Sequence, residues 1–127
     1  MRGHLDVLLI SEAPQRQRTG LSALRARGLR VTTATNSPRA CVLLARQPGI
    51  VLADLGSHAL FTPALVKQLN AVRGRCLVIA LHHQGVLNDT PGELTRLVVD
   101  GFAPAHGWPP HLFAELARNI PASAVLH

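Results

Sequence analysis

The stretch GIVLADLGS, residues 49–57, is the part of the sequence that decides the fold. It opens with an almost continuous apolar run, 50–53, of the kind found in parallel strands that are covered on both faces. The run ends on a carboxylate, Asp54, and Gly56 and Ser57 follow at once. A buried strand that ends on an acid and then turns predicts a candidate functional residue at the carboxyl end of a sheet.

The rest of the chain repeats this alternation of short apolar runs and helical segments. Strands are expected at 5–10, 29–34, 50–54, 76–81 and 100–105, and helices within 14–28, 36–49, 61–74, 90–98 and 108–120. Strands that alternate with helices of this length predict a parallel sheet, because a parallel crossover needs that much chain to return. We therefore expect a doubly wound, flavodoxin-like α/β fold with five parallel strands in the order 2-1-3-4-5 and helices on both faces.

Helix starts are signalled by short polar residues next to prolines. Ser37 before Pro38 predicts the N-cap of the second helix, and Thr62 before Pro63 predicts that of the third. Gly28 is expected to end the first helix.

Length and composition indicate one ordered domain. The chain has 127 residues, of which 47% are hydrophobic and 16% charged, so it can bury a core without disulfides. We assign residues 1–120 to the domain and 121–127 to a tail or linker. The apolar runs are far shorter than a membrane span, and no signal peptide is recognised, so a cytoplasmic location is expected.

Cysteines and net charge add little to a functional assignment. Cys41 and Cys76 lie on different expected elements without metal-ligand spacing, which favours reduced thiols. Thirteen Lys plus Arg against seven Asp plus Glu give a formal charge of +6. The densest arginine group, which is Arg16, Arg18, Arg25, Arg27 and Arg30, is interpreted as a solvated face, and direct nucleic-acid binding is not expected.

Two acids are expected at one edge of this sheet. Glu12 follows the first strand and Asp54 ends the third, and in the order 2-1-3-4-5 these strands are neighbours. A carboxylate pair suits Mg²⁺, which prefers oxygen ligands. Acids that merely end strands are an equally good interpretation of the spacing alone.

Three segments resemble bacterial response-regulator receiver domains, the CheY-like family. LLISEAP (8–14) resembles the family's first-strand segment VVDDEP, and PGIVLADL (48–55) resembles its phosphoacceptor strand PDLVLLDL. VDGFAPAH (99–106) resembles its fifth-strand segment ADGFLPKP. The resemblance covers about residues 5–120 in the same order.

The resemblance implies roles for residues at the first and third strand ends. Asp54 falls at the phosphoacceptor aspartate, which attacks phosphorus as a nucleophile. Glu12 falls at the second of the two acids that hold Mg²⁺, and Ser11 replaces the first. Of the family's two paired acids, this sequence therefore keeps only the second, Glu12.

The resemblance also places two changes at the fourth and fifth strands. His82 stands where the family has a Ser or Thr hydroxyl that reports phosphorylation. Ala105 stands where the family has a lysine that pairs with the phosphoryl group, and His106 is its neighbour. His106 is a shorter and only partly cationic substitute.

These departures favour a pseudo-receiver that acts by protein contact independently of phosphorylation. The alternative is a receiver that accepts a phosphoryl group on Asp54 from a histidine kinase, with Mg²⁺ as cofactor. A further alternative is a metal-binding domain that uses His82, His83 or His106 with Glu12 and Asp54. A nucleotide or flavin site is less favoured, since no Gly-rich turn follows the first strand. No enzymatic activity is expected beyond the domain's own aspartyl phosphorylation.

Partner expectations follow from the same resemblance. Receivers commonly dimerise through the face of helix 4, strand 5 and helix 5, and a histidine kinase or an attached output domain are further expected partners. The apolar residues available for this face are Leu97, Val98, Val99, Trp108, Leu112, Phe113 and Leu116. Ordinary core packing accounts for at least half of them.

Overall fold

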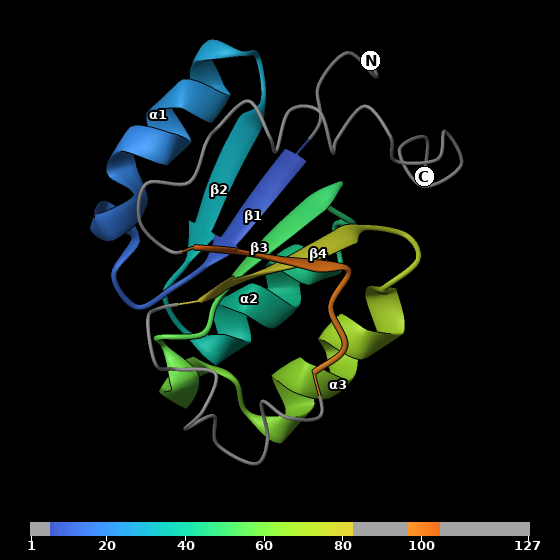
Figure 1. The fold of residues 1–127 in the computed structure, drawn as a ribbon. Helices are drawn as coiled ribbons and strands as arrows, with labels where there is room; N and C mark the ends of the chain where they lie inside the picture. Colours follow the sequence, from blue (N-terminus) through green and yellow to red (C-terminus); the bar gives the residue numbers. More distant parts are fainter. Residues whose placement is uncertain (1–5, 83–96, 105–127) are drawn as a thin grey trace.

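The computed structural model describes residues 6–82 and 97–104, and within them five parallel strands form one sheet (Figure 1). Their order is β2-β1-β3-β4-β5, as predicted. The strands are β1 (Asp6–Ile10), β2 (Arg30–Ala34), β3 (Ile50–Asp54), β4 (Leu77–His82) and β5 (Gly101–Pro104). Parallel pairing in this order confirms the doubly wound fold.

Helical segments connect the strands and cover both faces of the sheet. They are η1 (Pro14–Gln17), α1 (Arg18–Ala26), α2 (Ser37–Leu44), η2 (His58–Leu60) and α3 (Pro63–Val72). Figure 1 shows α1 on one side of the sheet and α2 and α3 on the other. The helices expected at 90–98 and 108–120 lie largely or wholly outside the described residues, and so does the tail at 121–127.

The starts of α2 and α3 correct one prediction and confirm another. Asn36, not Ser37, caps α2, because its extended backbone lets its side-chain oxygen accept from the Arg39 amide at 2.8 Å. Ser37 is already helical, and its hydroxyl hydrogen-bonds to the Thr62 hydroxyl at 2.8 Å. Thr62 caps α3 as predicted, accepting from the Leu65 amide. Gly28 has a positive φ of 86° just after α1, a conformation that glycine adopts without strain.

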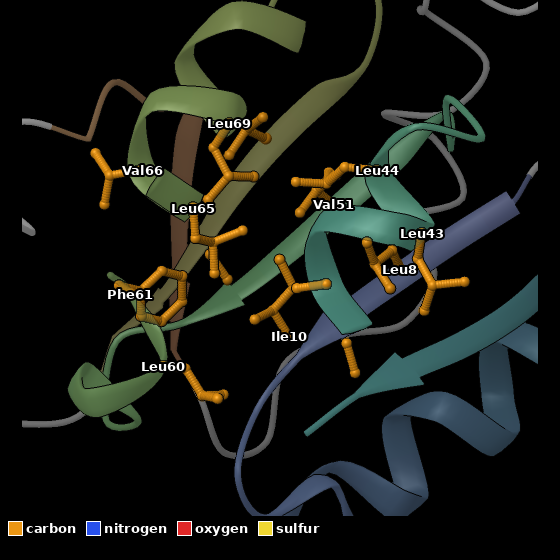
Figure 2. Packing of buried hydrophobic residues seen from close by; sticks show 14 of the residues in the cluster. Leu8, Ile10, Leu43, Leu44, Val51, Leu60, Phe61, Leu65, Val66 and Leu69 are labelled. Atoms are coloured by element: carbon orange, nitrogen blue, oxygen red, sulfur yellow. The ribbon is translucent and has the colours of Figure 1, made fainter. Parts of the chain in front are cut away.

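The core consists of two layers, one on each face of the sheet, because successive strand residues point to opposite sides. The layer beneath α1 contains Val7, Leu9, Ile50, Leu52, Ile79 and Leu81 together with Leu21 and Leu24. The layer beneath α2 and α3 contains Leu8, Ile10, Val51, Ala53, Val78 and Ala80 with Leu43, Leu44, Leu65 and Leu69, several of which are shown in Figure 2. All residues of β3 are buried, as expected for a central strand.

Both cysteines are free thiols, as predicted, and Cys76 is buried. Burial and the nearby negative charge of Asp100 raise the pKa of the Cys76 thiol from 9.0 to about 11. In the unfolded chain the thiol loses its proton at lower pH than in the folded protein. The contribution of this thiol to the free energy of unfolding is therefore constant below pH 9.0 and falls as the pH rises toward 11.

We expect the loss of stability that Cys76 causes in alkali to be at most about 3 kcal/mol in the free energy of unfolding. Urea unfolding of wild type and Cys76→Ala below pH 9 and near pH 11 measures it. The variant should be less stable than wild type at neutral pH, and the gap should narrow in alkali. Cys41→Ala is the matched control, and its free energy of unfolding should fall with pH as steeply as that of the wild type. The prediction is contradicted if the free energy of unfolding of Cys76→Ala falls with pH as steeply as that of the wild type.

Within the part of the chain that the structure describes, no helix has the length and apolar character required to cross a membrane.

Candidate functional site

The candidate site lies where β1 and β3 end side by side. Ile10 is paired with Ala53 in the parallel register, so the next residues, Ser11 and Asp54, emerge together at the carboxyl edge of the sheet. The backbone ladders continue past these ends, since the Ser11 amide donates to Ala34 O at 3.0 Å and the Leu55 amide to Leu81 O at 2.9 Å. Both residues are therefore held on rigid backbone.

Asp54 is a buried carboxylate with an exposed fraction of 0%. Its Oδ2 accepts hydrogen bonds from the Ser11 hydroxyl at 2.7 Å and from the Ser57 hydroxyl at 3.1 Å. Its Oδ1 accepts from the Gly56 amide at 3.0 Å. Hydrogen bonds to an ionised acceptor are about twice as strong as neutral ones, so these donors offset much of the cost of burying the charge.

The two serines are positioned by the chain that follows β1. The Ser11 hydroxyl, itself fully buried, accepts from the Ala13 amide at 3.1 Å. The Ser57 hydroxyl accepts from the Glu12 amide at 2.9 Å. Each hydroxyl thus receives one bond and donates one to Asp54, which fixes its proton toward the carboxylate. The network joins the loop after β1 to the loop after β3.

Glu12 reaches this network through its main chain. The residue is exposed. Its amide donates a hydrogen bond to the Ser57 hydroxyl, which in turn donates one to Asp54. The structure therefore brings the Glu12 segment to the predicted edge while its side chain faces solvent.

Ser57 is the site residue that sequence reasoning missed. It was visible only as part of the Gly-Ser turn after Asp54, and its amide closes that turn on Asp54 O at 3.0 Å. The available signal was a serine three residues after an acid, with a glycine between them in a turn. In such turns the acid side chain accepts hydrogen bonds from the backbone and hydroxyl groups that follow it.

The neighbour of Asp54 across the sheet is Leu81, which is paired with it in register and is completely buried. Because side chains alternate along a strand, Leu81 points to the same face as Asp54, and His82 points toward the α2 and α3 face. His82 is half-buried at the end of β4. Of the other predicted site residues, His83, Ala105 and His106 lie outside the described residues.

The described residues contain no group of three or more His, Cys, Asp or Glu side chains that could hold a metal ion. The two described hydroxyls beside the Asp54 carboxylate, those of Ser11 and Ser57, are neutral and point their protons at its Oδ2. A cation bound at Asp54 Oδ2 would require both serine hydroxyls to turn their protons away from it. The described residues therefore do not fit Mg²⁺ well, because this ion prefers carboxylates and waters.

No protein-family model matches the sequence, and no characterised protein matches it significantly. Solved structures do match. The receiver domain of a sensor histidine kinase from Pseudomonas aeruginosa, solved with magnesium in its active site cleft, superposes with a TM-score of 0.72 at 19% identity, covering 93% of this chain and 98% of that one.

This chain has the receiver fold.

Two further receiver-fold matches come from different contexts. The chemotaxis response regulator CheY4 of Vibrio cholerae gives a TM-score of 0.67 at 12% identity, with 93% of this chain and 99% of that chain covered. NtrX from Brucella abortus gives a TM-score of 0.68 at 14% identity. The match covers 95% of this chain and 27% of the longer NtrX chain. The receiver fold expected from the sequence is confirmed, at identities that show the fold alone.

Proposed function

We propose that this receiver-fold domain is a pseudo-receiver, which signals by protein contact without accepting a phosphoryl group on Asp54. The observation that carries the proposal is the state of that side chain: no part of it is exposed, and two hydroxyls and an amide occupy its oxygens. The polar network has the geometry of a structural element that holds two loops together.

Nucleophilic attack needs an oxygen lone pair that can approach phosphorus in line. The Asp54 oxygens are engaged by Ser11, Ser57 and Gly56. Attack through Oδ2 would break a charge-assisted bond, which is worth about 1.5–3 kcal/mol, and attack through either oxygen requires the buried site to open. The nucleophile is therefore both covered and stabilised in its ground state.

Among the residues that the structure describes, the neighbours of Asp54 at the ends of β1 and β4 carry no charge for a phosphoryl group. Catalysis of phosphoryl transfer is almost entirely electrostatic and relies on cations placed against the transferred group. Ser11 contributes a neutral hydroxyl at the family's first acidic position, and Leu81 contributes hydrocarbon on the same face. Both features support a domain that has kept the fold without the chemistry.

A phosphodonor experiment tests this proposal directly. The full chain is incubated with acetyl phosphate and Mg²⁺, and the intact mass is measured for wild type and Asp54→Asn. We expect no phosphorylated species in either. A phosphorylation-competent receiver treated in parallel verifies the donor, and stoichiometric phosphorylation of the wild type that Asp54→Asn abolishes would overturn the proposal.

The second candidate is a phosphorylation-competent receiver in which Asp54 is the nucleophile and Glu12, with the Ser11 hydroxyl, helps to hold Mg²⁺. It is favoured by the position of Asp54 at the end of β3 and by the magnesium in the cleft of the Pseudomonas domain. In this case Mg²⁺ alone would raise the melting temperature, because a ligand that binds only the folded state stabilises it. Under the pseudo-receiver proposal the melting temperature stays constant.

For partners we propose an attached output region or a histidine kinase, and a second copy of the chain. NtrX, in which this fold is 27% of the chain, shows the fold within a larger protein. Of the apolar residues expected on the dimer face, the structure describes Leu97, Val98 and Val99. Leu97 and Val99 pack against the core, whereas Val98 is 46% exposed with its amide held by Asn70 Oδ1 at 2.8 Å.

We expect Val98→Asp to weaken self-association by at least about tenfold, because a charge in an apolar contact must be desolvated. Sedimentation equilibrium of wild type and variant measures the dimer dissociation constant. Val42→Asp is the matched control, since Val42 is 52% exposed on α2, away from this face. A monomeric wild type would overturn the proposal of a second copy as partner, and an equal effect of both variants would show that the dimer does not use this face.

A further inference from the structure

A cavity of about 160 Å³ lies at the opposite end of the sheet from Asp54, beside the amino ends of β1 and β2. Its lining combines apolar, cationic, anionic and hydroxyl groups: Asp6, Leu8, Arg30, Thr32, Leu43, Arg46 and Pro48. None of these residues takes part in the Asp54 network. The cavity is therefore a separate candidate site.

The cavity exists because α2 is too short to cover this end of the sheet. Strand alternation puts Asp6 and Leu8 on the α2 face, and their register partners Arg30 and Thr32 share it. The helix ends at Leu44. Beyond it the chain turns sharply through Gln47, which has a positive φ of 56°, and returns to the sheet where the Gly49 amide donates to Asp6 O at 2.9 Å.

The floor and the rim of the cavity differ in chemistry. Leu8, Leu43 and Pro48 are buried and form its apolar part. Arg30 and Arg46 are exposed and carry two positive charges to its rim. The single carboxylate, Asp6, lies 3.6 Å from Arg30 with both side chains about half exposed or more, which is a loose ion pair.

The charge around the cavity also favours an anion. Arg30 and Arg46 give the cavity two positive charges against the one carboxylate of Asp6. This excess of positive charge attracts anions from solution. Because Asp6 is already paired with Arg30, Arg46 is the guanidinium in the cavity best placed for a ligand.

We propose that this cavity binds a small amphipathic carboxylate of about the size of benzoate. The ligand carboxylate lies at Arg46, with Arg30 as a second cation, and its hydrocarbon part packs on the apolar floor. The volume of about 160 Å³ has room for one aromatic ring, since a cavity of about 150 Å³ holds benzene. A guanidinium binds a carboxylate through two parallel hydrogen bonds, and the apolar lining beside it favours an anion that also carries hydrocarbon.

Titration of the full ¹⁵N-labelled chain with sodium benzoate, followed by amide chemical shifts, tests the proposal. We expect saturable shifts at Leu8, Thr32 and Leu43 with a Kd on the order of 1 mM. Benzamide, which has the ring without the charge, and inorganic phosphate, which has charge without the ring, should each bind about tenfold more weakly. Equal binding of phosphate or benzamide would overturn the amphipathic assignment.

Three variants locate the site. Arg46→Gln should weaken benzoate binding about tenfold, and Asp6→Asn should strengthen it a few-fold by removing the repelling carboxylate. Arg25→Gln, an equally exposed arginine on α1, is the control and should leave the affinity unchanged. No saturable shifts with benzoate, or equal losses in Arg46→Gln and Arg25→Gln, would overturn the proposal.

Discussion

Ser11→Asp is expected to lower the free energy of unfolding by about 3 kcal/mol at neutral pH in the absence of divalent cations. The Ser11 hydroxyl lies 2.7 Å from Asp54 Oδ2, and both residues are completely buried. A second carboxylate there would repel the first, and the donated hydrogen bond would be lost. Urea unfolding in the presence of a chelator measures the loss.

Mg²⁺ should restore part of the stability of Ser11→Asp, because the two carboxylates then form the kind of oxygen site that this ion prefers. The wild type should not respond. Ser11→Asn is the control for size, since it has nearly the same shape without the charge, and it should be destabilised much less. Equal stability of the Asp and Asn variants would show that the two carboxylates do not interact.

Asp54→Ala is expected to have the second large effect, a loss of about 3 kcal/mol. The substitution leaves the Ser11 and Ser57 hydroxyls and the Gly56 amide without the acceptor that they share, in a site closed to water. It also leaves a small cavity beside Leu81. Thermal and urea unfolding of the full chain measure the change.

Glu12→Ala is the matched control, because Glu12 is an exposed acid on the adjoining loop that contacts Ser57 through its main chain. Its stability should stay within about 0.5 kcal/mol of wild type. A small effect of Asp54→Ala would contradict a structural role for the carboxylate, and would favour an acid kept for chemistry.

The Ser11–Asp54–Ser57 network also gives the two loops at this edge a fixed arrangement. A receiver that switches needs these loops to have two states of similar free energy. In this chain one state is held by hydrogen bonds to a buried charge. Under the pseudo-receiver proposal, we expect this arrangement to present one surface constitutively.

Much of the fold was predictable because it depends on local patterns. Apolar runs of strand length separated by helical segments required a parallel sheet, and a chain of this size allows few topologies for it. The N-cap of α2 was placed one residue late, since Asn36 and Ser37 are both good caps and only the backbone conformation distinguishes them. Thr62 had no such competitor next to it.

The candidate site was predictable in place and less so in chemistry. That Asp54 ends a buried strand beside the end of β1 follows from order and register. That its oxygens are taken by hydroxyls does not, because a hydroxyl points to a partner only once the surrounding backbone has fixed its rotamer. Ser57 was therefore interpreted only as part of a turn and not as a partner of Asp54. No sequence motif indicated the cavity at the other end of the sheet.

The sequence by itself determined the strand order, the two apolar layers and the presence of an acid at the edge of the sheet, since periodicity and length govern these. Only the tertiary structure decided that Asp54 is buried, that Glu12 faces solvent, and that Arg30 and Arg46 line the same cavity. These features depend on which side chains from distant segments converge and exclude water. Convergence of that kind is set by packing in three dimensions and leaves no periodic trace along the chain.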